Sequence, residues 1–172
     1  MAAAPGLAGR RPVSTADLVV EIVTSPDDEV LEALSRLVPQ LSANPEPVDR
    51  QWLEEMVTAP GTSLFVAREP DGSRRIVGTL SLVVYRVPTG RHALIEDVVV
   101  DEQARGSGAG ALLVAAALRH AVDLGAGHVD LTSRPSREAA NRLYERAGMQ
   151  RRETNAYRFR AGSQLPGHAL GS

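Results

Sequence analysis

The 172-residue chain, with 43% hydrophobic and 23% charged residues, has the length and composition of one globular domain with a sizeable core. Only 3% of the residues are aromatic, so aliphatic side chains must fill that core. The chain has no cysteine, and all 19 basic residues are arginines. These two absences exclude thiol nucleophiles, disulfides and thiolate metal sites, and also Schiff-base lysines and Walker-type phosphate loops.

Charge is unevenly distributed along the chain, although its formal net value is only −2. Residues 17–102 carry 16 acids against 7 arginines, and residues 103–172 carry 5 acids against 10 arginines. The near-neutral total argues against nucleic acid as a partner. The asymmetry is compatible with a cleft that binds a polyanion at one end and a cation at the other, and equally with solvated charges scattered over the surface.

The two ends are predicted to be flexible tails around one domain at residues 17–160. Residues 1–16 are rich in small residues and have no apolar core of a secretory signal. Residues 161–172 contain several glycines and a proline and are expected to be equally loose. No stretch approaches the roughly 20 apolar residues that span a bilayer, so we expect a cytoplasmic protein that binds no membrane. Association into a homodimer is compatible with the sequence.

The first elements expected are a strand, a helix and a second, shorter helix. The β-branched residues of Leu18–Val23 predict the strand. Ser25–Asp28 supply a cap, a first-turn proline and acids, and so predict a helix that starts there. Ser42–Pro47 is polar and rich in proline, which makes it a candidate substrate-side lid before the short helix around Trp52.

Three strands and the longest helix are expected in the middle of the chain. Ser63–Arg68 and Ile76–Tyr85 predict a hairpin, because Glu69–Gly72 between them includes Pro, Asp and Gly, which favour turns. Ala93–Val100 predicts the next strand. A glycine-rich turn then leads into an alanine-rich helix at Ser107–Asp123.

The last third of the chain continues this alternation. His128–Thr132 predicts a strand, and Ser136 is a plausible N-cap for a helix that ends at Gly148. Met149–Glu153 and Tyr157–Arg160 predict two closing strands. The chain is therefore predicted to be α/β, with a mixed sheet of six or seven strands and about four helices.

The glycine-rich turn is the most informative segment. Residues 105–110 have the sequence Arg-Gly-Ser-Gly-Ala-Gly and open the long helix. Glycines keep side chains away while backbone N–H groups at the helix N-terminus point outward, and the helix dipole adds positive charge there. The turn therefore predicts a diphosphate site, with Arg105 as an added cation. It is equally compatible with close packing of the helix on a strand.

A dinucleotide-binding fingerprint is a rival interpretation of the same turn. Gly106, Gly108 and Ala111 fit its spacing, and Asp130 follows at nearly the required distance. In that fold the first glycine follows its strand almost directly, whereas here residues 101–105 intervene. Too little chain follows the turn for two mononucleotide-binding halves, so this interpretation ranks lower.

Two motifs resemble those of the GCN5-related N-acetyltransferases, the GNAT family. Glu96–Leu113 resembles the acetyl-CoA-binding motif of that family, Arg/Gln-x-x-Gly-x-Gly/Ala after a strand, with Arg105, Gly108 and Gly110 at the defined positions. Asn141–Met149 is similar to the family's following helix, which ends in Leu-Tyr-Glu and a glycine followed by an aromatic residue, but here Met149 stands in place of the aromatic.

The resemblance covers Leu18–Arg160 and implies a GNAT-like fold with a mixed, mostly antiparallel sheet. It also implies acetyl-CoA as co-substrate and N-acyltransferase activity. The residues that we predict to bind acetyl-CoA are Val98, Val99 and Val100 in the strand, Arg105, Gly106, Ser107, Gly108, Ala109 and Gly110 in the turn, and Arg137 and Asn141 further along.

The implied reaction is direct attack of a primary amine on the acetyl thioester in a ternary complex, without a covalent enzyme intermediate. Tyr144 is implied as the general acid for the departing thiolate. We predict Glu96 as the base, since strand alternation puts Glu96, Val98 and Val100 on one face and Asp97 on the other. A β-bulge, common in the family here, would upset this parity and could make Asp97 the base.

The acceptor is expected to be a small-molecule amine bound with the help of Asp97 and Tyr85. The acidic first half of the chain would favour a cationic amine. The alternatives are a protein or peptide amine as acceptor, and an inactive module that binds acyl-CoA as a sensor. No metal site is expected, because the four histidines have no ligand spacing.

Overall fold

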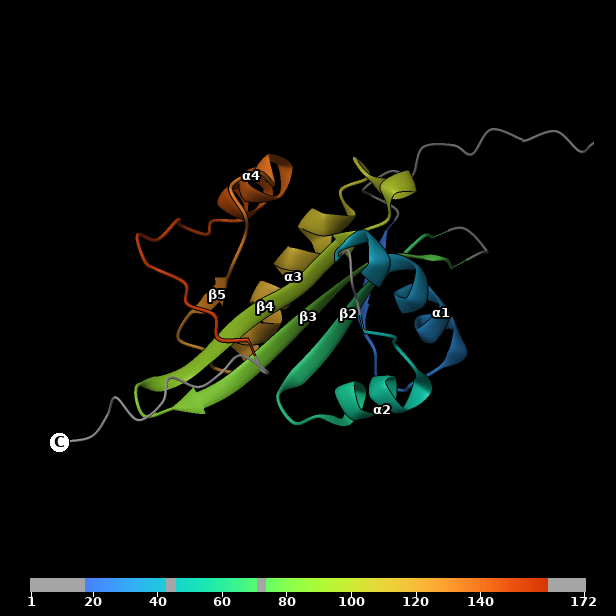
Figure 1. Cartoon of the computed structure of the whole chain (residues 1–172), viewed down its shortest axis with the longest axis horizontal. Coiled ribbons are helices and arrows are strands. Elements are labelled where there is room, and N and C mark those ends of the chain that lie inside the picture. The colour runs from blue at the N-terminus through green and yellow to red at the C-terminus, as the bar shows by residue number, and fades with distance from the viewer. Residues whose placement is uncertain (1–17, 43–45, 71–73, 161–172) are drawn as a thin grey trace, which may run out of the picture.

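The computed structural model describes residues 18–42, 46–70 and 74–160. These residues form one sheet with the strand order β1-β2-β3-β4-β5 (Figure 1). The strands are β1 Val19–Ile22, β2 Thr62–Arg68, β3 Ile76–Val87, β4 Gly90–Val100 and β5 Val129–Leu131. The first four strands pair antiparallel, and β5 pairs parallel to β4. The predicted α/β class with a mixed, mostly antiparallel sheet is confirmed.

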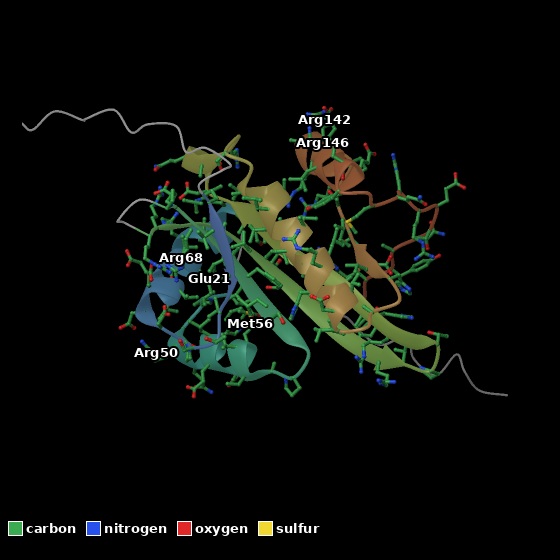
Figure 2. The ribbon with its side chains drawn as sticks, turned by 180° about the vertical axis from the view of Figure 1, so that it is seen from behind. Glu21, Arg50, Met56, Arg68, Arg142 and Arg146 are labelled. Atoms are coloured by element: carbon green, nitrogen blue, oxygen red, sulfur yellow. The ribbon has the colours of Figure 1, made fainter. Side chains whose placement is uncertain are left out.

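Helices cover both faces of this sheet. They are α1 Asp28–Leu37, α2 Arg50–Thr58, α3 Ala109–Asp123 and α4 Glu138–Arg146, with the short 3₁₀ helices η2 Val38–Gln40 and η3 Glu102–Ala104. α1 and α2 lie on one face and α3 lies on the other, in front of the strands when the molecule is seen from behind (Figure 2). α4 packs beside α3. None of the helices in the described ranges is both long and apolar enough to span a membrane.

Alternating side chains of the strands supply a core on each face. In β2, Phe65 and Ala67 are buried in the cluster beneath α3, whereas Leu64 and Val66 are buried in the cluster beneath α1 and α2. Small alanines on the buried side of α3 allow its backbone to approach the sheet closely. Among the buried hydrophobic residues of the described ranges, Phe65 is the one aromatic side chain, as the composition predicts.

The sheet is smaller than predicted, with five strands in the described part of the chain, because the two closing strands do not form there. Met149–Glu153 and Tyr157–Arg160 are irregular, and nearly all of their side chains are exposed. Charged and polar residues dominate Met149–Glu153. In the second segment Tyr157 and Phe159 alternate with arginines, but they are 90% and 60% exposed and so bury no apolar face against the sheet.

Helix starts also differ slightly from the predicted ones. Asp27, and not Ser25, caps α1, because its carboxylate accepts a hydrogen bond from the Val30 N–H at 2.8 Å. α3 and α4 begin at Ala109 and Glu138, just after the predicted positions. A carboxylate at a helix N-terminus also interacts favourably with the helix dipole, which explains why Asp27 is preferred over the serine.

Several predictions fall wholly or partly outside the described residues. These are the tails at residues 1–16 and 161–172, the centre of the Ser42–Pro47 passage and the end of the Glu69–Gly72 turn. The strands that this turn joins do pair antiparallel, so the predicted hairpin is confirmed.

β4 contains a β-bulge in its second half. The register of β3 and β4 shifts between Thr79 and Ser81, so that two residues of β4, Asp97 and Val98, oppose Leu80 alone. Asp97 has a φ of +51°, in the left-handed region that residues other than glycine rarely adopt. This is the bulge for which the family resemblance allowed.

The bulge exchanges the faces to which the following side chains point. Val98 packs with Ile95 in the cluster beneath α3, and Val99 is buried in the cluster beneath α1. Glu96 therefore shares its face with Val99. The prediction that Glu96, Val98 and Val100 share one face is wrong, because the bulge adds one residue to the alternation.

A buried carboxylate fixes the chain where β4 ends. The Asp101 side chain pairs with Arg36 and with Arg75, the latter at 2.6 Å, and accepts a hydrogen bond from the Gln103 N–H at 3.0 Å. We expect Asp101→Asn to lower the free energy of unfolding by about 2 kcal/mol, because the new amide group would face two guanidinium groups. Urea unfolding at neutral pH measures this loss. An unchanged transition midpoint would show that the ion pairs contribute nothing to stability.

Candidate functional site

β4 and β5 separate after a short common stretch. They pair only at Ala93, Leu94 and Ile95. Within the described residues, no strand pairs with the β5 side of β4 from Glu96 to Val100. A cleft of about 840 Å³ opens beside this edge, and we call it the large cleft. Its walls include Val98, Val99, Val100, Arg105, Gly106, Gly108, Ala109 and Gly110, and much of α4.

The glycine-rich turn places backbone N–H groups at the large cleft. Gly106 and Gly108 have φ angles of +83° and +87°, which other residues rarely adopt. A Cβ at Gly106 would meet no atom within 4 Å, so the space beside it is open. Because the first hydrogen bond of α3 runs from Leu112 N–H to the Gly108 carbonyl at 3.1 Å, the N–H groups of residues 109–111 have no acceptor within the helix, and that of Ala109 approaches the Ser107 hydroxyl at 3.4 Å. This arrangement fits an anionic group such as a diphosphate.

Gly110 also lines the large cleft, and its small size is required for helix packing. A Cβ at this position would lie 3.0 Å from Leu143 Cδ1 and 3.6 Å from Val100 Cγ2. The absence of a side chain therefore lets α4 pack on the first turn of α3.

Arginines add positive charge to the large cleft. Arg105, Arg142 and Arg146 line it, and Figure 2 shows the latter two on α4. Arg105 pairs with Glu102 at 3.1 Å and Arg142 pairs with Glu138 at 3.3 Å. These ion pairs are exposed and therefore weak, so both guanidinium groups remain available to an anionic ligand.

A second cleft of about 610 Å³, the side cleft, adjoins the large cleft. Four residues line both clefts, and we call them the junction: Leu41, Val98, Arg137 and Tyr144. Arg137 donates a hydrogen bond to the Leu41 carbonyl at 3.1 Å, so the start of α4 is connected to the end of η2 across the junction. The other charged residues of the side cleft are Glu96, Asp97, Arg134, Arg158 and Arg160.

Tyr144 is the residue of the junction that can donate a proton. Its ring packs, with Leu143, against the core cluster beneath α3, and it is partly buried. Burial raises the pKa of Tyr144 above its ordinary value, and the charge of Arg137 partly offsets this effect. The hydroxyl is therefore protonated at neutral pH, as a general acid must be.

The two predicted acids, Glu96 and Asp97, both line the side cleft. Desolvation raises the pKa of Glu96, the charge of Asp97 raises it further, and Arg158 lowers it. A raised pKa makes a carboxylate a stronger base. Since the bulge brings both acids to one cleft, strand alternation cannot distinguish them, and the raised pKa favours Glu96.

Three predicted site residues line neither cleft. The Asn141 amide donates a hydrogen bond to the Arg134 carbonyl at 3.1 Å and so holds the turn before α4. Ser107 is buried, and its hydroxyl accepts a backbone N–H at 3.4 Å. Tyr85 lies farther along β3, where it packs edge-on against His92 with 5.9 Å between ring centres. The structure thus gives all three residues internal contacts.

Sequence reasoning missed part of the side cleft. Arg158 and Arg160 line it, but they lie in an irregular segment that carries no motif. Tertiary contacts bring this segment to the sheet, for example the pairing of Arg152 with Asp130 at 3.5 Å. The surplus of arginine in the second half of the chain was the one signal that could have indicated these residues.

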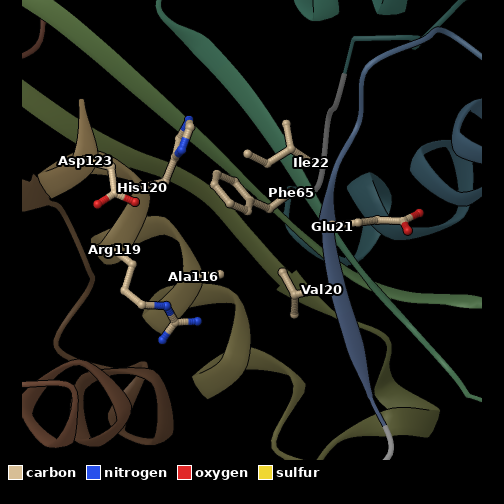
Figure 3. Close-up of a pocket in the computed structure, with 8 residues that line it drawn as sticks. All are labelled: Val20, Glu21, Ile22, Phe65, Ala116, Arg119, His120 and Asp123. Carbon is tan, nitrogen blue, oxygen red and sulfur yellow. The ribbon is translucent and has the colours of Figure 1, made fainter.

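A third groove, of about 370 Å³, lies between α3 and the edge strand β1 (Figure 3). None of the predicted site residues lines it. Its walls are formed by Val20, Glu21, Ile22 and Phe65 from the sheet and by Ala116, Arg119, His120 and Asp123 from α3. The candidate site is therefore the pair of clefts beside β4.

Solved structures of several acetyltransferases have the same fold as this chain. A putative acetyltransferase from Agrobacterium tumefaciens str. C58 is 25% identical, with a TM-score of 0.70 over 83% of this chain and 99% of that chain. An aminoglycoside acetyltransferase from an uncultured soil metagenomic sample is 21% identical, with a TM-score of 0.74 over 85% and 97%. Glucosamine-6-phosphate N-acetyltransferase from Arabidopsis thaliana is 22% identical, with a TM-score of 0.68 over 82% and 98%.

Comparison at the sequence level defines the family. Curated protein sequences give no significant match. Residues 28–149 match the family model described as "Acetyltransferase (GNAT) family". This matched range covers well over half of the chain. The matched range contains the bulge of β4, the glycine-rich turn, α3 and α4. The chain therefore belongs to the GNAT acetyltransferase family.

Proposed function

We propose that the protein transfers an acetyl group from acetyl-CoA to a primary amine of a small molecule. The observation that carries this proposal is that the large cleft and the side cleft meet at Tyr144, with Glu96 in the side cleft. Acetyl-CoA in one cleft and the amine in the other would then react between Glu96, which can accept a proton, and Tyr144, which can donate one. Two of the similar structures are named for small-molecule substrates, an aminoglycoside and glucosamine 6-phosphate.

The residues of the large cleft fit coenzyme A. The N–H groups of the glycine-rich turn, together with Arg105, Arg142 and Arg146, would bind its phosphate groups. The free edge of β4 at Val98–Val100 would bind the amide groups of the pantetheine arm through backbone hydrogen bonds. Acetyl-CoA as the donor agrees with the cytoplasmic location expected from the sequence.

The reaction requires two proton transfers at the junction. The amine nitrogen attacks the thioester carbonyl carbon, and a C–N bond forms while the C–S bond breaks. Glu96 accepts the proton that leaves the nitrogen, directly or through a water, and Tyr144 gives its proton to the departing sulfur. A chain without cysteine suits this direct transfer, because no thiol is needed to carry the acetyl group.

We expect kcat/KM for amine acetylation to rise with pH through the raised pKa of Glu96. The raised pKa keeps the carboxyl protonated, and thus unable to accept a proton, at a higher pH than for an ordinary glutamate. Glu96→Gln should remove this acid limb of the profile and lower turnover by about tenfold, a modest loss because water can also accept the proton. Profiles of both proteins with the same amine provide the measurement. An acid limb that persists in the variant would assign it to another group.

The same variant should keep its stability. A carboxyl whose pKa is raised by folding holds its proton more tightly in the native state. The native state therefore loses stability as the pH rises from the pKa of Glu96 in the unfolded chain to its raised pKa in the folded protein. Glu96→Gln removes this cost. Its Tm at pH 7 should therefore equal or exceed that of the wild type, and a clearly lower Tm would give Glu96 a structural role.

Thermal unfolding and thiol release test the proposed function. Coenzyme A should raise the Tm and NAD should not, because a ligand that binds the native state stabilises it. A panel of primary amines with acetyl-CoA should then release free thiol. Protection by coenzyme A without thiol release from any amine would contradict the enzymatic proposal and indicate a binding module instead. Protection by NAD would support the dinucleotide interpretation.

A further inference from the structure

We propose that the acceptor carries an anionic group, a phosphate or a carboxylate, in addition to its amine, and that arginines of the side cleft bind this group. The inference rests on the proposed function, since it concerns the second substrate of that reaction. Its basis is the charge of the side cleft. Four arginines and two acids line this cleft, so positive charge exceeds negative charge where the acceptor would bind.

In the part of the chain that the structure describes, three of these arginines have no carboxylate partner. Within the described residues, no ion pair forms at Arg134, Arg158 or Arg160, and the charge of Arg158 acts on Glu96 from a distance. The arginines of the first half of the chain that pair with carboxylates are Arg36, Arg50, Arg68, Arg74 and Arg75. Guanidinium groups gathered in one cleft repel one another, and a bound anion would relieve that repulsion.

The fourth arginine, Arg137, has a different role. It lines both clefts, donates to the Leu41 carbonyl at 3.1 Å, and lies close enough to Tyr144 to affect its pKa. We therefore assign Arg137 to the junction. The anion site consists of the other three arginines.

The acids and the three arginines come from different walls of the side cleft. Glu96 and Asp97 lie at the bulge of β4, Arg134 lies in the loop after β5, and Arg158 and Arg160 lie in the C-terminal segment. An acceptor with both charges can place its amine at Glu96 and its anionic group at the arginines. Two such anchors fix its orientation, so that the amine is held beside the junction.

The same charges disfavour an acceptor with positive charges alone. Of the acids of the first half, which were expected to favour a cationic amine, Glu96 and Asp97 line the side cleft, whereas Glu21 and Glu29 pair with Arg68 and Asp101 pairs with Arg36. The four arginines of the side cleft outnumber its two acids. A polycationic aminoglycoside would meet more positive than negative charge there.

Matched amines that differ in the anionic group test the inference. We expect glucosamine 6-phosphate to have a kcat/KM at least about tenfold above that of glucosamine, or 4-aminobutyrate to exceed its carboxamide by the same factor. The first pair tests phosphate and the second tests carboxylate. Equal or better rates with both neutral amines, or a preference for a polycationic aminoglycoside, would overturn the inference. Thiol release would then still support the proposed function.

Measurements of amine affinity test the inference independently of turnover. Calorimetry with the coenzyme A complex should detect the preferred anionic amine and show weaker binding of its neutral partner, whether or not acetyl transfer occurs. No difference in affinity for either pair would overturn the inference. Failure of every amine to release thiol, with this affinity difference intact, would contradict the proposed function alone.

A double variant tests the residues. Arg134→Gln with Arg160→Gln should reduce the preference for the anionic amine over its neutral partner about tenfold, through a higher KM for the anionic amine. Arg158 is kept because its charge also acts on Glu96. Arg86→Gln serves as a matched control, since Arg86 is exposed on β3 and lines neither cleft. An unchanged preference in a double variant of wild-type Tm would overturn the assignment.

Discussion

Tyr144→Phe is expected to lower turnover by about 10²-fold or more while leaving the affinity for coenzyme A within about twofold. The phenyl ring can still pack against the core cluster beneath α3, so the fold and the wall of the large cleft are preserved. The variant lacks only the proton that the departing thiolate requires. Initial-rate measurements give the change in turnover, and calorimetry gives the affinity for coenzyme A.

Tyr157→Phe is a matched control for this experiment. Tyr157 is 90% exposed and lines neither cleft, so the same loss of a hydroxyl should have no effect there. Unchanged turnover in Tyr144→Phe would place the general acid elsewhere. A parallel loss of coenzyme A affinity would instead make Tyr144 a binding residue.

Gly108→Asp should weaken coenzyme A binding by at least about 100-fold. Gly108 lines the large cleft and caps α3 with a φ of +87°, so a carboxylate there would face the position proposed for the phosphate groups. Repulsion between like charges adds to the strain of a non-glycine residue in this conformation. Calorimetry and the coenzyme A-dependent rise in Tm measure the loss.

Gly125→Asp controls for the strain at Gly108. Gly125 follows the other end of α3 with a φ of +77° and lines neither cleft. Both variants lose a glycine with positive φ and gain one negative charge, but only Gly108→Asp should lose coenzyme A binding. Retained binding in Gly108→Asp, or an equal loss in both variants, would remove the phosphate site from this turn.

The sequence predicts elements well where burial and local pattern agree. The apolar run of Ile76–Tyr85 and the alanine-rich run of Ser107–Asp123 correspond to β3 and α3, because each buries a continuous apolar face. The predicted strands at Met149–Glu153 and Tyr157–Arg160 fail for the opposite reason. Tyr157 and Phe159 alternate with arginines as in a strand, but both side chains are exposed, and an alternating pattern yields a strand only where its apolar side chains are buried.

The site shows the same division between local and tertiary information. The glycine-rich turn and Tyr144 could be located from motifs, since each is defined by a few neighbouring residues. Helical spacing placed Asn141 beside Tyr144 but could not reveal its hydrogen bond to the Arg134 carbonyl. Arg158 and Arg160 reach the side cleft only through the tertiary fold, and no local pattern encodes that approach.

The close contact at Gly110 connects the glycine-rich turn with α4, the helix that carries Tyr144. A methyl group at this position would lie 3.0 Å from Leu143 Cδ1, tighter than side chains normally tolerate, and Leu143 directly precedes Tyr144. The interhelical spacing between α3 and α4 thus sets the depth at which the phenol sits. A substitution at Gly110, whose added Cβ would meet Leu143 and Val100 but neither Tyr144 nor Glu96, would displace α4 by tenths of an ångström and so change the rate of the proton transfer proposed for Tyr144.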